Sequence, residues 1–244
     1  MAVKSIQYKT HTLDISYEII NPDAKVDLII LHGWGSNKNL MKQAFSPYMK
    51  GFRHIYIDLP GFGKSTCCLA MTTADVARIV EMFMVLINAS KDVVLGHSFG
   101  GKVATILDPK VLVLLGSAGI YTRKPLSIKL KIAIFKTLKI FGLAKLRSLF
   151  VAQDAKTLNE PMYQTFKNVV DEDFSDQFKS FKGKALVCWG DKDTATPLSS
   201  GEKISELIED SSLEVYDGDH YFFLQHSEAV SKKVEETFLS TLGN

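Results

Sequence analysis

The sequence predicts an α/β fold, with a mostly parallel sheet, helices on both of its faces and one helical insertion. Short apolar runs such as Val26–Leu31 and Val111–Leu115 alternate with segments of helical periodicity, which is typical of parallel strands buried on both sides. The alternation stops between residues 120 and 183 and then resumes. We therefore expect one core domain, formed by residues 1–119 and 184–244, with residues 120–183 inserted as a helical cap.

The composition fits a folded protein with a substantial core. Of the 244 residues, 46% are hydrophobic and 23% are charged. Three cysteines are too few for a disulfide framework, and no C-x-x-C spacing indicates zinc. The chain shows no apolar leader and no run of about 18 apolar residues. We therefore expect a cytoplasmic protein without a metal site.

The elements can be predicted in order along the chain. Alternation over residues 4–20 predicts an antiparallel hairpin around Thr10-His11-Thr12. The elements expected before the insertion are a strand at 26–31, a helix to about Met49, a strand at 54–58, a helix over 73–89 with Thr73 as N-cap, a strand ending near Ser98, a helix, and a strand at 111–115. Those expected after it are a strand at 185–189, a helix near 199–209, a strand at 213–216 and a last helix near 227–241.

A candidate nucleophile lies where one of these strands meets a helix. The apolar run from Val93 ends in Gly96-His97-Ser98-Phe99-Gly100-Gly101, and a G-x-S-x-G pentapeptide in this context places its serine on a sharp, strained turn. A serine hydroxyl is a poor nucleophile at neutral pH, so it needs a histidine base and a carboxylate that orients the base. We therefore predict Ser98 as a nucleophile and expect its partners later in the chain.

Two later strand ends supply such partners in the order acid, then histidine. Asp191 and Asp193 follow the strand that ends at Trp189, and His220 lies between the last strand and the last helix. From that loop the His220 ring can reach over the sheet edge toward Ser98. The residues alone leave both aspartates open as the acid, whereas Asp219 is too close to the histidine to fold back onto its ring.

Together these stretches resemble α/β-hydrolase-fold serine hydrolases over essentially the whole chain except the insertion. The motifs that carry the resemblance are L-H-G-W-G at 31–35, D-L-P-G-F-G-K-S at 58–65, G-H-S-F-G-G at 96–101, W-G-D-K-D-x-x-x-P at 189–197 and G-D-H at 218–220. The resemblance implies that Asp193 is the triad acid and that the backbone N–H groups of Trp34 and Phe99 form the oxyanion hole. It also implies that His32 is a structural hydrogen-bonding residue.

The resemblance implies hydrolysis of a small-molecule carboxylic ester through an acyl-enzyme on Ser98, with no cofactor. In size and in the H-G-W-G and G-x-S-x-G-G motifs, the chain is similar to acyl-carrier-protein methyl ester esterases. One alternative is hydrolysis of a C–C bond in ring-fission products of the 2-hydroxy-6-oxo-dienoate type, although the H-G-x-G-P-G loop typical of those enzymes is absent. The other is a catalytically silent protein of this fold that binds a ligand or partner.

The predicted cap is strongly basic. Between Tyr121 and Phe150 it has no acidic residue and eight basic ones, namely Arg123, Lys124, Lys129, Lys131, Lys136, Lys139, Lys145 and Arg147. Three explanations stay open: a solvated lid surface, an acidic carrier protein that docks on the cap, and an anionic membrane surface. The membrane is disfavoured because Gly142 would interrupt an interfacial helix. We expect no nucleic-acid partner.

Overall fold

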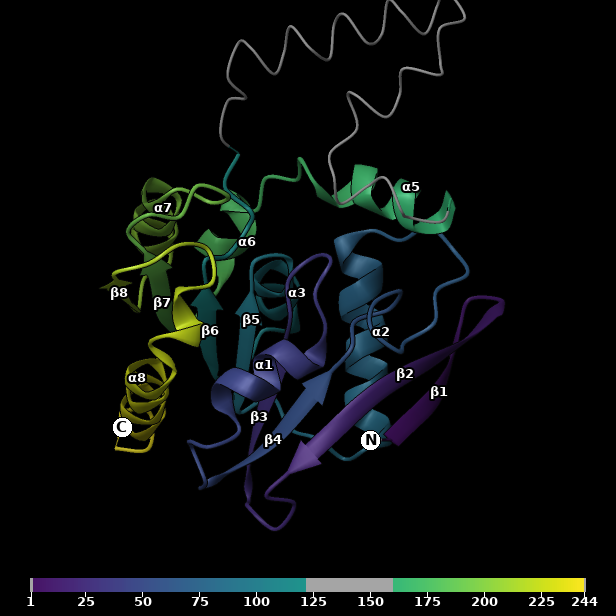
Figure 1. Cartoon of the computed structure of the whole chain (residues 1–244), viewed down its shortest axis with the longest axis horizontal. Coiled ribbons are helices and arrows are strands. Elements are labelled where there is room, and N and C mark those ends of the chain that lie inside the picture. Colours follow the sequence, from purple (N-terminus) through teal and green to yellow (C-terminus); the bar gives the residue numbers. More distant parts are fainter. Residues whose placement is uncertain (1, 122–159, 244) are drawn as a thin grey trace, which may run out of the picture.

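A computed structural model describes residues 2–121 and 160–243, so every expectation about residues 122–159 lies outside it. The described strands form one eight-stranded sheet in the order β1-β2-β4-β3-β5-β6-β7-β8 (Figure 1). The strands are β1 (Ala2–Tyr8), β2 (His11–Ile20), β3 (Val26–Leu31), β4 (Phe52–Ile57), β5 (Val93–His97), β6 (Val111–Leu115), β7 (Lys184–Gly190) and β8 (Ser211–Tyr216). Only the β1–β2 and β2–β4 pairs are antiparallel. The mostly parallel sheet and the N-terminal hairpin are thus confirmed.

Helices cover both faces of this sheet, as predicted. The described helices are α1 (Lys38–Phe45), α2 (Thr73–Leu86), α3 (Phe99–Leu107), α5 (Glu160–Val169), α6 (Ser175–Ser180), α7 (Leu198–Leu207), α8 (Ser227–Leu239) and a 3-10 turn, η3 (Phe222–Leu224). The apolar side chains of α1 and α8 pack in one cluster, and those of α2, α3 and α7 pack in another on the opposite face. The sheet is therefore the middle layer of three.

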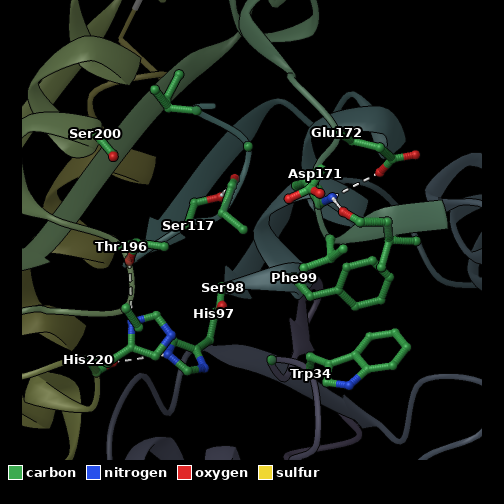
Figure 2. A pocket seen from close by; sticks show the side chains of 18 of the residues that line it. Trp34, His97, Ser98, Phe99, Ser117, Asp171, Glu172, Thr196, Ser200 and His220 are labelled. Atoms are coloured by element: carbon green, nitrogen blue, oxygen red, sulfur yellow. Dashed lines mark hydrogen bonds and ion pairs between the residues drawn. The ribbon is translucent and has the colours of Figure 1, made fainter. Parts of the chain in front are cut away.

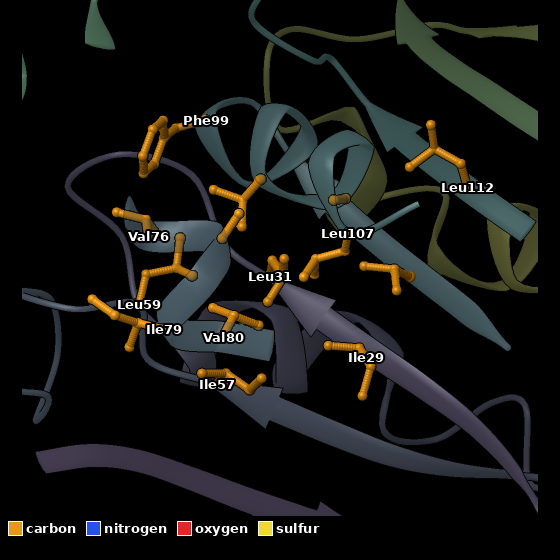
Figure 3. Packing of buried hydrophobic residues seen from close by; sticks show 14 of the residues in the cluster. Ile29, Leu31, Ile57, Leu59, Val76, Ile79, Val80, Phe99, Leu107 and Leu112 are labelled. Atoms are coloured by element: carbon orange, nitrogen blue, oxygen red, sulfur yellow. The ribbon is translucent and has the colours of Figure 1, made fainter. Parts of the chain in front are cut away.

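The central strands feed both layers because successive side chains point to opposite faces of a strand. In β3, Ile29 and Leu31 belong to the cluster with α2 and α3, whereas Leu28 and Ile30 belong to the cluster with α1 and α8. Figure 3 shows the first cluster, in which Leu31 lies among side chains from both helices. All four residues are fully buried, which explains why the strand is apolar from Leu28 to Leu31.

Two predicted helix boundaries are wrong by a few residues. The first helix ends at Phe45 rather than near Met49, and Ser46 is its C-cap. The N-cap of α2 is Thr72 rather than Thr73: the Thr72 hydroxyl accepts from the N–H of Asp75, and the Asp75 carboxylate accepts from the N–H of Thr72. This reciprocal capping box satisfies two N–H groups that the first turn leaves without partners.

The described part of the predicted insertion lies between two strands that pair directly. The chain leaves the sheet after β6 and returns at β7, and those strands are neighbours. Residues 160–183 contain α5 and α6, while the eight basic residues of the predicted cap lie outside the described residues. The division into core and cap stays a prediction. Among the described residues, no helix is long and apolar enough to cross a bilayer.

Candidate active site

Ser98 lies on a strained turn between β5 and α3. Its φ of 50° and ψ of −113° fall outside the regions that non-glycine residues ordinarily adopt, and such conformations cost about 1–3 kcal/mol each. Its N–H donates to the carbonyl of Leu115, 3.0 Å away, and its own carbonyl accepts from the N–H of Ala118 at 3.1 Å. The turn is therefore held by bonds to the end of the neighbouring strand β6.

Two glycines permit this turn by allowing backbones to approach closely. A Cβ atom on Gly96 would lie 2.3 Å from the carbonyl oxygen of Gly100, and one on Gly100 would lie 2.6 Å from the carbonyl oxygen of His32. Both distances are far inside van der Waals contact. The first and last glycines of the pentapeptide are thus required by packing at the turn.

Asp193 and His220 are brought together from two neighbouring loops. Asp193 follows β7 and His220 follows β8, and Nδ1 of His220 lies 2.7 Å from Oδ2 of Asp193. The Asp193 side chain is fully buried, and the His220 side chain is 17% exposed. Because a carboxylate can only accept, a hydrogen lies on Nδ1, so the neutral tautomer of this ring has its lone pair on Nε2.

The surroundings keep the Asp193 carboxyl ionised. Burial raises its pKa, but the hydrogen bond from His220 and that from the N–H of Thr196 lower it, and the net pKa lies below the usual value. Its Oδ1 accepts from the N–H groups of Ala195 and Thr196 at 2.8 and 2.9 Å. Hydrogen bonds donated to a carboxylate favour its ionised form.

Asp191, the other acid left open by the sequence, has a different position. Its side chain accepts from the N–H of Gly218 at 3.0 Å, and its N–H donates to the carbonyl of Tyr216. It therefore braces the β7 and β8 loops against each other. The structure thus places Asp193, and not Asp191, on the ring of His220.

Ser98 and His220 face one pocket at the carboxyl ends of the parallel strands (Figure 2), whereas the buried Asp193 does not line it. The pocket has a volume of about 570 Å³ and is lined by both Ser98 and His220. On one side of Ser98 lie the rings of Trp34, Phe99 and Phe166; the Trp34 centroid is 5.6 Å from that of Phe99 and 5.3 Å from that of Phe166. The other side has small polar side chains that include Ser200.

The predicted oxyanion-hole residues flank the serine. Phe99 begins α3, where backbone N–H groups have no partner within the helix. Trp34 follows Gly33, and a Cβ atom on Gly33 would lie 3.1 Å from the Cβ of Ser98, so the loop after β3 passes directly beside the nucleophile turn. Both residues line the pocket. Their arrangement is compatible with two amides directed at one oxygen atom.

His32 and His97 are buried beside the site and are bound by backbone groups. In His32, Nδ1 lies 2.7 Å from the carbonyl oxygen of Gly33, and Nε2 accepts from the N–H of Leu59 at 3.0 Å. In His97, Nε2 lies 3.0 Å from the backbone oxygen of His220. Burial lowers the pKa of His32 to about 4 and that of His97 to about 3. Both rings are therefore neutral near pH 7, and His97 anchors the loop that carries His220.

A buried ion pair in the pocket wall was not foreseen from the sequence. Nζ of Lys102 lies 2.9 Å from Oε2 of Glu172, and the Lys102 side chain is only 3% exposed. Glu172 also accepts from the hydroxyl of Thr73, and Lys102 donates to the carbonyl of Val169. These bonds tie the segment after α5 to the helix that follows Ser98. The sequence around Lys102, one turn into an apolar helix, does not indicate that Glu172 is its partner.

Within the described residues, no group of three or more His, Cys, Asp or Glu side chains is arranged to hold a metal ion. The functional groups at the site are a hydroxyl, an imidazole and a carboxylate. The arrangement is suited to general-base activation of a serine hydroxyl.

Comparison with known proteins gives the same fold. A family model described as alpha/beta hydrolase fold matches residues 28–107. A 2-hydroxy-6-oxononadienedioate/2-hydroxy-6-oxononatrienedioate hydrolase from Pseudomonas putida is 26% identical over an alignment of length 250 that covers 87% of this chain and 87% of that protein. A pimeloyl-acyl-carrier-protein methyl ester esterase from Pectobacterium carotovorum is 39% identical over 80 residues, or 32% of this chain and 29% of that protein. The structure of an esterase from Exiguobacterium antarcticum aligns with a TM-score of 0.73 and 23% identity, covering 93% of this chain and 96% of that one.

Proposed function

We propose that this chain, a hydrolase with the α/β-hydrolase fold, cleaves a carboxylic ester through an acyl-enzyme formed on Ser98. The observation that carries the proposal is His220, which lines the same pocket as Ser98 and whose Nδ1 lies 2.7 Å from the carboxylate of the buried Asp193. An imidazole held in this tautomer has a free Nε2 lone pair to accept the serine proton. A serine on a strained turn beside such a base is the combination that acyl transfer needs.

In the proposed mechanism, His220 removes the proton from Ser98 as Oγ attacks the ester carbonyl carbon. Asp193 keeps its charge and stabilises the imidazolium that forms. The backbone N–H groups of Trp34 and Phe99 hold the oxyanion, each contributing about 2.7–4 kcal/mol. The imidazolium then protonates the leaving alcohol, and in the second half-reaction His220 activates a water molecule that releases the acid.

The shape of the pocket favours an apolar acyl group. Trp34, Phe99 and Phe166 present three aromatic rings on one side of Ser98, and aromatic side chains bind apolar groups through large contact areas. We therefore place the acyl chain against these rings and the alcohol toward the smaller side chains near Ser200.

The test is hydrolysis of p-nitrophenyl esters from acetate to decanoate by the wild type and by Ser98→Ala. We expect turnover that peaks at one chain length and disappears in the variant. Turnover that persists in Ser98→Ala contradicts the assignment of the nucleophile. Absence of turnover with every ester, together with an unreactive Ser98, supports the alternative of a silent binding protein.

Hydrolysis of a C–C bond is the second candidate, because a relative that matches over 87% of both chains is named a 2-hydroxy-6-oxononadienedioate hydrolase. The same serine, histidine and aspartate would serve it. The early loop, His32-Gly33-Trp34-Gly35-Ser36-Asn37, lacks the H-G-x-G-P-G form expected of that subfamily. Incubation with a 2-hydroxy-6-oxo-dienoate substrate decides between the two: a kcat/KM above that of the best ester favours the C–C reaction.

We further propose that the acyl group of the substrate is attached to an acidic acyl carrier protein. A relative that is 39% identical over 80 residues acts, by its name, on a pimeloyl-acyl-carrier-protein methyl ester. The eight basic residues between Tyr121 and Phe150 supply the complementary charge in the sequence. We expect a carrier-bound methyl ester to be cleaved with a lower KM than the free methyl ester, and expect added salt to remove the difference. Equal KM values would exclude the carrier.

A further inference from the structure

The hydroxyl of Thr196 lies at the centre of the Asp193–His220 pair. Its Oγ1 is 2.9 Å from Oδ2 of Asp193, 3.3 Å from Nδ1 of His220 and 3.1 Å from the backbone oxygen of Gly116. Figure 2 shows the link from Thr196 to His220 at the edge of the pocket. One side chain therefore touches both members of the pair and the turn that follows β6.

The hydroxyl has one hydrogen for two groups that can only accept. Oδ2 of Asp193 and the carbonyl of Gly116 both accept, whereas Nδ1 of His220 carries a hydrogen and donates. The hydroxyl of Thr196 can donate either to Asp193 or to Gly116. In both cases its oxygen keeps a lone pair that can accept from Nδ1–H of His220. When His220 is an imidazolium, this N–H belongs to a cation, and a hydrogen bond to a charged group is roughly twice as strong as a neutral one.

The backbone fixes Thr196 in this place. Its N–H donates to Oδ1 of Asp193 at 2.9 Å, and its carbonyl accepts from Nε1 of the buried Trp189 at 2.8 Å. Gly116, with a φ of 48°, turns directly beneath the pair, and a Cβ atom there would lie 3.1 Å from Oδ2 of Asp193 and 3.2 Å from Nδ1 of His220. The hydroxyl is thus preorganised before any substrate binds.

We propose that Thr196 is a positioning residue that stabilises the charged, imidazolium form of His220 during the reaction. Its hydroxyl donates to Asp193 in the resting enzyme, and it can turn its hydrogen to the carbonyl of Gly116 when His220 becomes charged. The oxygen then accepts from Nδ1–H alongside the carboxylate. This inference rests on the proposed function, because it concerns the step in which His220 takes the serine proton.

The other groups around the ring do not provide this contact. His97, from the end of β5, packs with its ring centroid 4.6 Å from that of His220, and Tyr221 packs at 5.6 Å. His97 is neutral, with a pKa of about 3, and its Nε2–H is directed at the backbone oxygen of His220. Asp193 is thus the charged partner on the ring, and Thr196 is the neutral acceptor beside it.

The test compares Thr196→Val, Thr196→Ser and wild type, with Thr194→Val as the matched control. Thr194 is an exposed threonine of the same loop, so Thr194→Val makes the same chemical change without altering the contacts of Asp193 and His220. The readouts are kcat and KM for the best p-nitrophenyl ester, the pH dependence of kcat/KM, and the rate at which a fluorophosphonate labels Ser98. If Thr196→Val does not fold, Thr196→Ala against Thr196→Ser isolates the hydroxyl in the same way.

We expect Thr196→Val to lower kcat and the labelling rate by about 10- to 100-fold, which is the size of a hydrogen bond to a charged group. KM should stay within about twofold, since valine keeps the shape of the side chain that lines the pocket. Thr196→Ser should recover most of the rate, and Thr194→Val should behave as wild type. The low-pH limb of kcat/KM should move to lower pH in Thr196→Val, because the charged ring loses an acceptor.

Other outcomes overturn the proposal in distinguishable ways. A low-pH limb that moves to higher pH would mean that the hydroxyl acts only as a donor to Asp193. Equal losses in Thr196→Val and Thr196→Ser would mean that the methyl group, and so packing, matters instead. Wild-type kcat in Thr196→Val overturns the inference while leaving Ser98 as the nucleophile. If the wild type itself shows neither ester turnover nor labelling of Ser98, the proposed function and this inference are both overturned.

Discussion

His32 and His220 lie at the same edge of the sheet but differ in what binds their rings. His32 follows β3, is fully buried, and uses both ring nitrogens on backbone groups of neighbouring loops. His220 follows β8, keeps 17% of its side chain exposed, and has a carboxylate on Nδ1. The comparison teaches that the chemistry of the partner, rather than the residue type, separates a structural histidine from a candidate base.

The physical reason is the stability of the charged ring. Burial lowers the pKa of His32 to about 4, because an apolar surrounding disfavours the cation, and it outweighs the hydrogen bond to the carbonyl of Gly33, which raises the pKa. The Asp193 carboxylate offers His220 a negative charge that persists after proton transfer. A base must hold the proton that it takes, so only the second environment suits catalysis.

The largest effect is expected when the proposed base is removed. His220→Ala should lower kcat by about 10⁴- to 10⁶-fold, as does loss of a triad member in serine hydrolases generally, and Ser98→Ala should match it. Steady-state kinetics with the best ester measures both. His226→Ala is the control, because His226 lies nearby and bonds the backbone oxygen of Asp217. A comparable loss in His226→Ala would contradict the contrast between the histidines.

Neutralising the Asp193 carboxylate that binds Nδ1 of His220 should have the next largest effect. We expect Asp193→Asn to lower kcat by about 10⁴-fold, since an amide can leave the ring in the wrong tautomer. Asp191→Asn should lower it less than about threefold, because Asp191 braces two loops and does not reach the ring. Equal losses in these two variants would remove the reason for choosing Asp193.

The neutral histidines should make folding depend on pH. A histidine whose pKa is lowered in the folded state stabilises it fully above its unfolded pKa of about 6.5, and this stability is lost as pH falls toward the folded value. The pKa values of His32 and His97 in the folded protein are about 4 and about 3. When the pH falls from 7 to 5, each should therefore lower the free energy of unfolding by about 2 kcal/mol. His54, whose pKa is also lowered by burial, acts in the same direction.

Urea unfolding at pH 7 and pH 5 measures this dependence, and calorimetry in buffers of different ionisation enthalpy counts the protons. We expect about two protons to be taken up per molecule on unfolding at pH 5. Proton release, or equal stability at the two pH values, would show that the buried rings are already charged in the folded protein.

The smallest effect is expected from the structural histidine itself. His32→Ala leaves the N–H of Leu59 and the carbonyl of Gly33 without their partner, which should cost about 1–3 kcal/mol of stability, or several degrees in Tm for a chain of this size. The folded variant should keep kcat within about tenfold of wild type. A loss as large as that of His220→Ala would mean that His32 acts in the chemistry.

Much of the fold was predictable because its signals are local. Apolar runs such as Val111–Leu115 mark buried parallel strands, and the G-x-S-x-G turn needs its glycines whatever surrounds it. The strand ends also predicted that Ser98, the two candidate acids Asp191 and Asp193, and His220 lie near one sheet edge. Their catalytic roles stay proposals, although the structure brings Asp193 onto the ring of His220 as the resemblance implied.

The rest depended on contacts between distant residues. The choice between Asp191 and Asp193 needs the path of the β8 loop, which the residues do not encode locally. Thr196 is one of two threonines in its loop, and only the tertiary fold brings its hydroxyl to the pair. The N-cap of α2 was missed by one residue for a local reason: Thr72 and Thr73 are both cap-forming residues, and Asp75, three residues after Thr72, completes a capping box with Thr72.

Covalent labelling with a fluorophosphonate tests the central claim most directly, because it requires an activated serine but no knowledge of the substrate. Wild type, Ser98→Ala and His220→Ala are incubated with the probe, and the modified peptide is identified by mass spectrometry. We predict one adduct per chain on Ser98 in the wild type, none in Ser98→Ala, and labelling slowed at least about 10³-fold in His220→Ala. Labelling of Ser98 at the wild-type rate in His220→Ala, or no adduct in the wild type, would contradict the account.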